Sequence, residues 1–410
     1  MTMLSEGSKL RFVVFGTLLA IGVLGSLASA ATPATGAEKR TPIGQPPGNS
    51  FPIILTQPGQ YYLTGNLTSV GPNSGVFVTT SGVKLDLNGY SIIGTGGSNT
   101  IGVSCPFPTA KNLEVCNGRV TNCGVGVEMF VCSNVRVHHM NCSGNRNSGI
   151  AAGDGCLIEE CMVNDMSAPS GSLTGIRGGK NANIRNCVVS NINTAAPSNS
   201  GEGILCGSGA RIHNCTVAGV TYTGTNGQVE GIVTGDQSLI EGCISRDNKL
   251  LGSGSNPCHG IAAGNDSHVI NCVSSNNQNS TGGAGTCLGI KVDSNCLVTG
   301  NNVTSNTIIG TGISAGIRVN KNTRVERNSV AGHGGSSANK NYGILAGFTD
   351  STGNVIVKNS TMNNTGAGIR CDNTSGSNYH AENVQKETTP FSQAAVLNVA
   401  GTGDRADVAF

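Results

Sequence analysis

The sequence predicts an all-β fold, a parallel β-helix in which about a dozen coils stack on one another. A Gly-Ile pair returns every 25 to 29 residues, and short β-branched segments alternate with Gly, Asn and Ser throughout the same region. A repeat of this length holds one turn of a solenoid, which cannot bury its apolar residues alone. The pairs are Gly149-Ile150, Gly175-Ile176, Gly203-Ile204, Gly231-Ile232, Gly260-Ile261, Gly289-Ile290, Gly316-Ile317, Gly343-Ile344 and Gly368-Ile369.

Positions counted from the isoleucine of each pair carry the same kind of side chain from coil to coil. The eighth position holds Ile or Val, as at Ile158 and Val298, and the eleventh holds Cys or Asn, as at Cys161 and Asn301. About 27 residues at ~3.3 Å per residue trace three short strands and three bends. Strands of successive coils therefore form long parallel sheets around a core of Ile, Val, Leu and Cys.

Five of the 16 cysteines occupy the eleventh position on successive coils. Parallel side chains about 4.8 Å apart suit a disulfide poorly, so we expect a column of reduced, buried thiols. Asparagines continue the column, where their amides can bond along the stack. The chain has no C-x-x-C pair, and we therefore predict no metal site. The column comprises Cys161, Cys187, Cys215, Cys243, Cys272, Asn301, Asn328 and Asn359.

The chain divides into four predicted segments. Residues 1–30 form a signal peptide that ends at the small-residue cleavage site Ala28-Ser29-Ala30, and its apolar run falls short of the ~20 residues of a membrane span. Residues 31–50 form a flexible linker, 51–380 the β-helix and 381–410 a C-terminal cap or tail. We expect an exported protein, extracellular or periplasmic, with no membrane span after signal removal.

The composition gives no electrostatic basis for binding nucleic acid or an anionic membrane. The formal net charge is +2, and charged residues make up 12% of the chain. The chain has no Trp, and aromatic residues make up 4% of it, which leaves few rings for stacking against sugars.

Two segments near the start of the predicted β-helix resemble a known family. Gln57–Leu63 and Val83–Gly89 (sequence VKLDLNG) are similar to the first coil of secreted right-handed parallel β-helix proteins. The later I-x-x-(N/C)-x-V units resemble the generic repeat of pectin-lyase-like folds. The resemblance covers nearly all of the chain beyond the signal segment and implies a right-handed, single-stranded β-helix. It implies no one activity, because such proteins include lyases, hydrolases, epimerases and adhesins.

The candidate catalytic residues are Glu202, Glu230 and His259. They stand two residues before the isoleucine on three successive coils, beside loops that differ most between coils. Two carboxylates at strand spacing lie about 5 Å apart, the separation of a retaining glycosidase pair. The alternative reading is a set of solvent-facing loop residues. Cys258–Ile261 also resembles the Gly-His-Gly of polygalacturonases, although the paired aspartates of those enzymes are absent.

The candidate substrate-binding residues are Arg177, Lys291, Arg318 and Tyr222. The three cations follow the isoleucine directly, on the outer face of the sheet, where they could hold acidic groups of a polysaccharide. The alternative reading is that they keep the sheet edge soluble. We predict no cofactor. Four aspartates lie near this strand without the pattern of a calcium loop, namely Asp154, Asp236, Asp266 and Asp293.

Two functions remain open from the sequence. One is an exported scaffold that binds a polysaccharide or cell-surface glycan without catalysis. The other is a polysaccharide lyase, glycoside hydrolase or epimerase that works in a groove beside the Gly-Ile sheet. The sequence specifies neither the substrate nor the oligomeric state.

Overall fold

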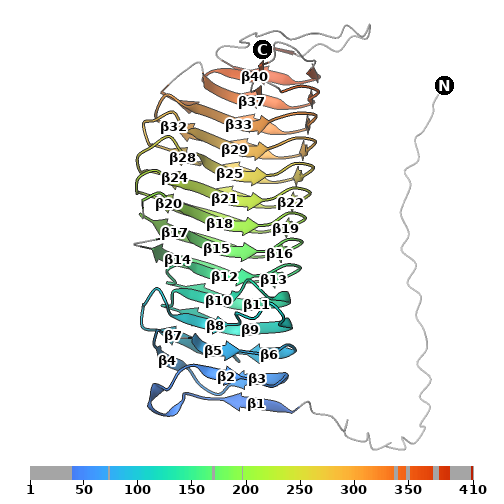
Figure 1. The fold of residues 1–410 in the computed structure, drawn as a ribbon. Helices are drawn as coiled ribbons and strands as arrows, with labels where there is room; N and C mark the ends of the chain where they lie inside the picture. Colours follow the sequence, from blue (N-terminus) through green and yellow to red (C-terminus); the bar gives the residue numbers. More distant parts are fainter. Residues whose placement is uncertain are drawn as a thin grey trace, which may run out of the picture. The chain divides into compact units, whose positions relative to one another are not determined.

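The computed structural model describes residues 39–72, 74–168, 171–195, 197–336, 340–347, 351–372, 378–387 and 408–409. From Arg40 onward these residues belong to one unit, a right-handed parallel β-helix of about a dozen coils. The coils follow one another in chain order, from the blue to the orange and red part of the ribbon (Figure 1). The predicted fold class is thus confirmed.

One sheet carries the Gly-Ile pairs and contains 13 parallel strands in chain order. Ile150, Ile176 and Ile204 lie in register on neighbouring strands and are fully buried. We call it the Gly-Ile sheet. Its strands are β2 (Ile53–Leu55), β5 (Ser74–Val78), β8 (Ile101–Ser104), β10 (Val125–Met129), β12 (Ser148–Ala152), β15 (Leu173–Gly178), β18 (Ser200–Cys206), β21 (Gln228–Thr234), β25 (Cys258–Ala263), β29 (Thr286–Val292), β33 (Ile313–Val319), β37 (Asn341–Gly347) and β40 (Ala367–Asp372).

The second sheet has 30 strands and bends within each coil at the Cys and Asn column, so that it has two limbs. The long strands β9 (Lys111–Thr121) and β11 (Ser133–Ser143) run through both limbs. The other strands of the first limb are β1 (Arg40–Ile43), β3 (Gly59–Leu63), β6 (Val83–Asp86), β13 (Leu157–Glu159), β16 (Asn183–Arg185), β19 (Arg211–His213), β22 (Leu239–Glu241), β26 (His268–Ile270), β30 (Leu297–Thr299), β34 (Arg324–Glu326), β38 (Val355–Val357) and β41 (Tyr379–Ala381).

The second limb completes each coil and returns the chain to the Gly-Ile sheet. Its strands are β4 (Leu67–Val70), β7 (Ser91–Gly94), β14 (Met162–Ala168), β17 (Val188–Thr194), β20 (Thr216–Tyr222), β23 (Ile244–Arg246), β24 (Lys249–Leu250), β27 (Val273–Ser275), β28 (Gln278–Asn279), β31 (Asn302–Thr304), β32 (Thr307–Ile308), β35 (Ser329–Ala331), β36 (Gly334–Gly335), β39 (Ser360–Met362), β42 (Val384–Lys386) and β43 (Val408–Ala409). A short 3₁₀ helix, Pro47–Asn49, lies between β1 and β2.

The glycine of each Gly-Ile pair is required by close packing across the coil. A Cβ atom added to Gly203 would lie 2.3 Å from Cγ1 of Val217 and 2.6 Å from the carbonyl oxygen of Gly231. No side chain fits at either distance, so the repeat needs glycine wherever the opposite limb packs against this strand.

The column at the eleventh position forms as predicted. The side-chain Nδ2 of Asn328 donates to Oδ1 of Asn359 at 2.9 Å, and Nδ2 of Asn301 donates to Oδ1 of Asn328 at 2.9 Å. Among the thiols, Sγ of Cys187 donates to the carbonyl oxygens of Arg185, at 3.3 Å, and of Ile158 in the coil before. All 16 cysteines of the chain are buried and free.

A second column of polar side chains runs up the stack and was not predicted. The side-chain Nδ2 of Asn248 donates to Oδ1 of Asn277 at 2.7 Å, and Asn277 donates in the same way to Asn306 at 2.6 Å. His333 and Asn364 continue this column in the next two coils. Because each amide bonds along the stack, these buried polar groups are satisfied without water.

The ends of the β-helix differ from the predicted boundaries. Strand β1 pairs with Gln60–Leu63, so the fold begins within the predicted linker of residues 31–50. Strands β41 and β42 extend the stack past residue 380 to Lys386. The predicted signal peptide, residues 1–30, and most of the predicted tail lie outside the described residues. Among those that are described, no helix has the length and apolar character to cross a membrane.

The buried His333 predicts that the fold loses stability in acid. Its Nδ1 accepts from the backbone N–H of Asn306 and its Nε2–H donates to the carbonyl of Val303, both at 3.2 Å, which fits a neutral ring. Burial lowers the pKa of His333 to about 4. The unfolded chain takes up a proton near pH 6.5 and the folded chain does not. Stability should therefore fall by about 3 kcal/mol as the pH drops from 6.5 to 4.

The variant His333→Asn keeps an amide in this column and removes the titrating group, so its stability should change less over that pH range. Urea unfolding at pH 7 and pH 4.5 measures both slopes, with the half-buried His213→Asn as a matched control. Equal losses of stability in the parent and His333→Asn would show that another group causes the acid sensitivity.

Candidate functional site

Glu202, Glu230 and His259 lie in register on the adjacent strands β18, β21 and β25 of the Gly-Ile sheet. Thr174 on β15 continues the same column in the coil before. Register partners in a parallel sheet are about 4.8 Å apart, so these side chains are immediate neighbours. The structure brings the three predicted catalytic residues together, and their catalytic role stays a prediction.

One carboxylate oxygen of Glu202 forms a hydrogen bond with the coil before it. Its Oε2 accepts from the hydroxyl of Thr174 at 2.9 Å, and its Oε1 accepts from the hydroxyl of Ser200 at 2.8 Å. The residue is 9% exposed. Both carboxylate oxygens therefore have a donor, and hydroxyl donors take the place of water around a nearly buried charge.

Glu230 is bonded toward the coil after it. Its Oε1 lies 3.2 Å from Nδ1 of His259, and its Oε2 accepts from the side-chain amide of Gln228 at 3.4 Å. The other ring nitrogen of His259 lies 3.4 Å from the hydroxyl of Thr286. The two glutamates thus turn in opposite directions along the stack, and one of them forms a carboxylate–imidazole pair.

A small hollow opens beside this column, on the flank where the loops enter the Gly-Ile sheet. Its volume is about 220 Å³, and it shares Ser200 and Gln228 with the column. These two residues are the donors to Glu202 and Glu230. Every lining side chain carries a hydroxyl or an amide, and we call the site the polar hollow. It is lined by Ser172, Ser198, Asn199, Ser200, Asn226, Gln228 and Asn256.

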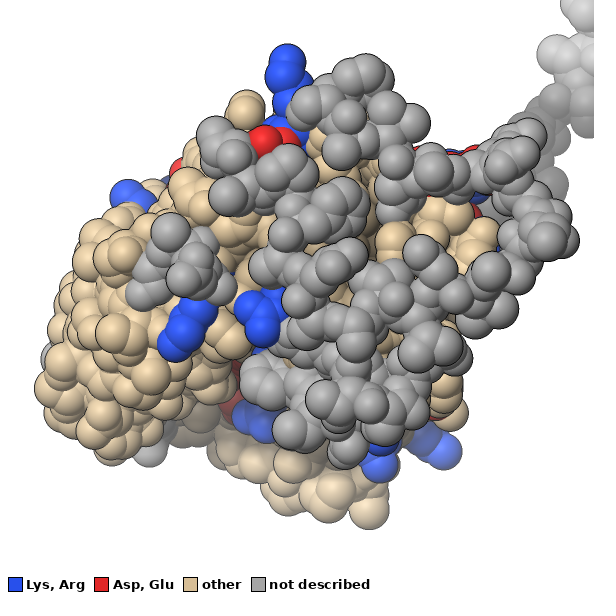
Figure 2. Space-filling model, turned by 90° about the horizontal axis from the view of Figure 1, so that it is seen from above, with Lys and Arg blue, Asp and Glu red and all other residues tan. Residues whose placement is uncertain are grey.

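The predicted cations do not form one row. Arg177 is exposed and lies over the ring of Phe130, at 3.9 Å from its centroid. Lys291 and Arg318 are register partners on β29 and β33, and Lys291 pairs with Asp293 at 3.3 Å. Burial lowers the pKa of Arg318, an effect that Asp293 opposes. Seen from the end that carries β40, basic side chains are scattered over the surface (Figure 2).

The prediction that Tyr222 binds substrate is wrong. It lies on β20 with its side chain fully buried, so it cannot contact a glycan on the surface. Its hydroxyl donates to the carbonyl of Thr225 at 2.7 Å. A Cβ at Gly227 would lie 2.2 Å from the Tyr222 ring, which shows that a glycine makes the space for it.

Two of the four aspartates near this strand bond to the backbone. Asp154 Oδ1 accepts from the N–H of Lys180 at 2.7 Å, and Asp236 Oδ1 accepts from the N–H of Asn265 at 2.8 Å. Both contacts join a turn to the next coil. This is a structural role, and these side chains give no support to a calcium site.

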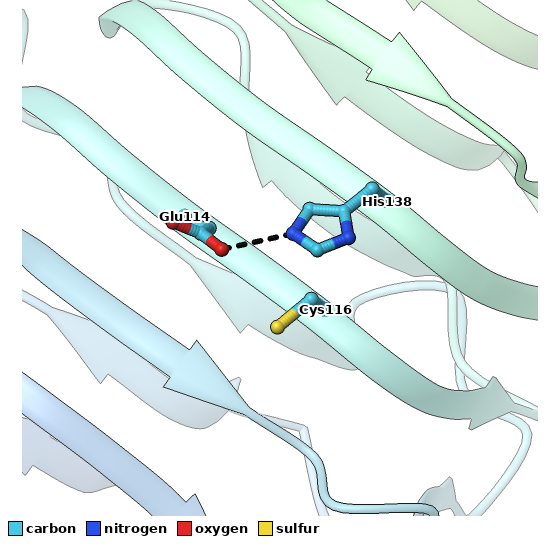
Figure 3. A group of neighbouring side chains, drawn as sticks. All are labelled: Glu114, Cys116 and His138. Atoms are coloured by element: carbon cyan, nitrogen blue, oxygen red, sulfur yellow. Dashed lines mark hydrogen bonds and ion pairs between the residues drawn. The ribbon is translucent and has the colours of Figure 1, made fainter. Parts of the chain in front are cut away.

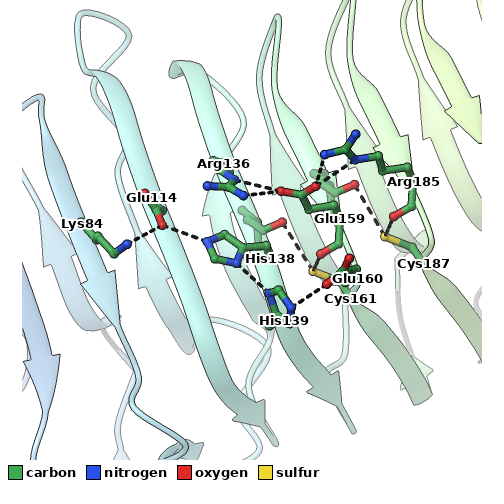
Figure 4. A network of polar contacts seen from close by, with 12 residues as sticks. Lys84, Glu114, Arg136, His138, His139, Glu159, Glu160, Cys161, Arg185 and Cys187 are labelled. Carbon is green, nitrogen blue, oxygen red and sulfur yellow. Dashed lines mark hydrogen bonds and ion pairs between the residues drawn. The ribbon is translucent and has the colours of Figure 1, made fainter. Parts of the chain in front are cut away.

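A second polar group, which the sequence analysis missed, covers the outer face of the first limb (Figure 4). Glu159, whose side chain is 6% exposed, accepts from Arg136 at 2.6 Å and from Arg185 on the other side. Nearby, Oε1 of Glu114 lies 2.9 Å from both Nζ of Lys84 and Nε2 of His138. We call these residues and their neighbours His139 and Glu160 the charged ladder.

The charged ladder had a signal in the sequence. The ninth position after the isoleucine holds a charged or titratable residue on four successive coils, namely Glu159, Arg185, His213 and Glu241. His213 and Glu241 are themselves 3.3 Å apart. Reading only the apolar eighth and thirteenth positions left this column out, although alternation along a strand places it on the outer face.

A surface hollow of about 700 Å³ lies along the bend next to the charged ladder. His139 and Glu160 line it, together with Arg119 and the apolar Met162. His139 and Glu160 bond to each other at 2.5 Å, and about half of each side chain is exposed. The charged ladder is therefore accessible to solutes from this hollow.

No protein-family model matches the chain, and no curated protein matches it. Solved structures do match. The A-module of the mannuronan C-5 epimerase AlgE6 from Azotobacter vinelandii is 16% identical with a TM-score of 0.51, and the match covers 82% of this chain and 92% of that chain. The A-module of the mannuronan C-5 epimerase AlgE4 from the same organism is 11% identical with a TM-score of 0.45, covering 84% and 89%.

The periplasmic alginate epimerase AlgG is 12% identical with a TM-score of 0.32, and the match covers 86% of this chain and 77% of that one. At these sequence identities the likeness shows only that the fold is shared. This conclusion rests on the AlgE6 module, which has the TM-score of 0.51. The chain is therefore a right-handed parallel β-helix protein, as the strand order and register also show.

The Glu159 ion pairs make a stability prediction with a definite pH dependence. Burial raises the pKa of Glu159, but the bonds from Arg136 and Arg185 outweigh burial and hold this pKa below its ordinary value. The ion pairs therefore stabilise the fold above the unfolded-state pKa of about 4.3, and this contribution is lost as the pH falls through the lower folded-state pKa.

We expect Glu159→Gln to lower the free energy of unfolding by about 1–2 kcal/mol at pH 7, because both arginines are half exposed and partly screened. The deficit should shrink toward pH 3. Urea midpoints at the two pH values measure it, and Glu241→Gln, with its more exposed carboxylate, is the matched control. A deficit that is the same at both pH values would contradict the ion-pair explanation.

Proposed function

We propose that this protein is exported and binds a polysaccharide on the loop flank of the Gly-Ile sheet, at the polar hollow. The observation that carries the proposal is the concentration of hydroxyl and amide side chains in that hollow, directly against the column of Glu202, Glu230 and His259. A rigid sheet that carries side chains of this kind can hold a ligand in a fixed orientation.

The chemistry of the hollow matches sugar hydroxyl groups. Hydroxyls and side-chain amides both donate and accept hydrogen bonds, as sugar hydroxyls do. Ser172, Ser200 and Gln228 come from three successive coils, and Ser200 and Gln228 are register partners. A ligand with repeating hydroxyl groups can therefore bond to equivalent side chains as it runs along the stack.

Two further observations support a polysaccharide ligand and an exported protein. The AlgE6 module, which shares this fold, is named as an epimerase of mannuronan, a polysaccharide. The first 30 residues have the charge, apolar run and cleavage site of a secretory signal. A scaffold that works outside the cytoplasm and recognises glycan fits both.

A polysaccharide-active enzyme is the second candidate, and the Glu230–His259 contact favours it. A carboxylate that holds an imidazole orients a general acid or base. Glu202, on the coil before, supplies a second carboxylate. Lyases and epimerases remove a proton from a sugar carbon, and a paired histidine beside a ligand hollow is suited to that step.

Substitutions in the polar hollow should weaken glycan binding. Asn199→Ala and Gln228→Ala each remove a donor and acceptor from the hollow, and each should raise the Kd of the preferred polysaccharide about 5- to 10-fold. Binding to a panel of neutral and acidic polysaccharides, followed by calorimetry on the best ligand, measures the effect. Gln278→Ala, on β28 of the other sheet, is the matched control.

The same panel distinguishes the two candidates. New reducing ends, unsaturated uronate and a change in sugar configuration are read together in the parent, Glu230→Gln and His259→Gln. Turnover that is lost in both variants while binding persists would establish the enzyme. Binding without turnover would establish recognition alone, and a panel with neither would contradict both functions.

A further inference from the structure

Three metal-ligating side chains of different types meet on the outer face of the first limb (Figure 3). Glu114 and Cys116 lie on β9 and His138 lies on β11, where Cys116 and His138 are register partners. One oxygen of Glu114, Sγ of Cys116 and one ring nitrogen of His138 all lie within 4.8 Å of one another. Strand pairing thus brings together a thiol, an imidazole and a carboxylate, the ligand types that zinc prefers.

The second ring nitrogen of His138 is held by a relay. Its Nδ1 lies 2.8 Å from Nδ1 of His139, and Nε2 of His139 bonds to Glu160. Protein zinc sites depend on an outer bond of this kind, which fixes the ring and leaves the other nitrogen to the metal. When His138 donates from Nδ1, its Nε2 faces Glu114 with a free lone pair.

The number of protons that the two histidine rings can supply favours a cation between Glu114 and His138. The chain of contacts Glu114–His138–His139–Glu160 contains three hydrogen bonds, which need three protons. Two neutral imidazole rings carry only two. A metal ion between Oε1 of Glu114 and Nε2 of His138 would take the place of the third of these protons.

Cys116 is not one of the thiols that donate to the backbone. The thiols of Cys161 and Cys187 donate to backbone carbonyls. The thiol of Cys116 is fully buried and has no hydrogen-bond partner within the part of the chain that the structure describes. Burial, with Asp86 and Glu114 nearby, raises the pKa of Cys116 to about 11. A metal ion would stabilise the thiolate in this acidic environment.

We propose that Glu114, Cys116 and His138 form a zinc site with an open fourth position. Tetrahedral zinc places ligand atoms about 3.4–3.6 Å apart, so the Glu114–His138 contact of 2.9 Å need open only slightly and Sγ move inward by about 1 Å. Lys84 shares Oε1 of Glu114 and would yield that oxygen or leave Oε2 to the metal.

Zinc binding would release the thiol proton of Cys116, because the thiolate is the form that binds zinc. The apparent affinity for zinc should therefore rise with pH.

Cobalt is the probe, because it takes the place of zinc and reports its ligands by colour. Purified, reduced and chelator-treated protein should bind one equivalent of Co²⁺, with a thiolate-to-cobalt charge-transfer band and the visible bands of four-coordinate cobalt. Zn²⁺ should abolish both. Cys116→Ser should remove the charge-transfer band, and His138→Gln should weaken binding at least 10-fold.

His139→Gln tests the relay at a residue whose side chain is about half exposed, and it should weaken Co²⁺ binding about 10-fold without moving the charge-transfer band. The matched controls are Cys206→Ser, another buried thiol, and His213→Gln, the histidine three coils further along. Circular dichroism checks the fold of each variant. Absence of the charge-transfer band, or a band that persists in Cys116→Ser, would overturn the proposal.

Discussion

Strand register from coil to coil is the constraint on which the rest of this structure depends. Each residue lies about 4.8 Å from its equivalent in the coil before and the coil after, because parallel strands pair without shift along most of the stack. Side chains therefore come in columns, and each column must be compatible with its own repetition. Apolar columns give the core, and buried polar columns survive only where each member bonds to the next, as Asn301 and Asn328 do.

That rule explains how much of the fold the sequence predicted. Isoleucines and the Cys and Asn column repeat because a buried position tolerates few residue types, and a repeated type is visible without a structure. The column that contains His333 was missed because it lies further from the isoleucine than the positions that were compared, and because one histidine interrupts its asparagines. The start at Arg40 was missed because β1 precedes the first Gly-Ile-like unit and has no repeat to mark it.

The candidate site was predicted less completely, for a related reason. Glu202, Glu230 and His259 share one position of the repeat, so their meeting followed from register. Tyr222 was misplaced because the side that a residue faces within a loop-rich limb depends on local alternation, and on Gly227, which makes room for the ring. The hydrogen bonds that turn the two glutamates apart depend on side-chain rotamers, which no pattern of residue types specifies.

Because charged residues are scarce in this chain, a place where several of them meet points to a specific role. Charged residues make up only 12% of the sequence, yet Lys84, Glu114, Arg136, Glu159 and Arg185 meet on one limb within a few coils. The basic side chains that are visible from the β40 end, in contrast, lie at separate places on the surface (Figure 2). The Gly-Ile sheet and the first limb are different faces of one rigid stack. The proposed glycan recognition on the first face and the proposed metal binding on the second can therefore be altered separately, and loss of one would leave the other as a measure of the intact fold.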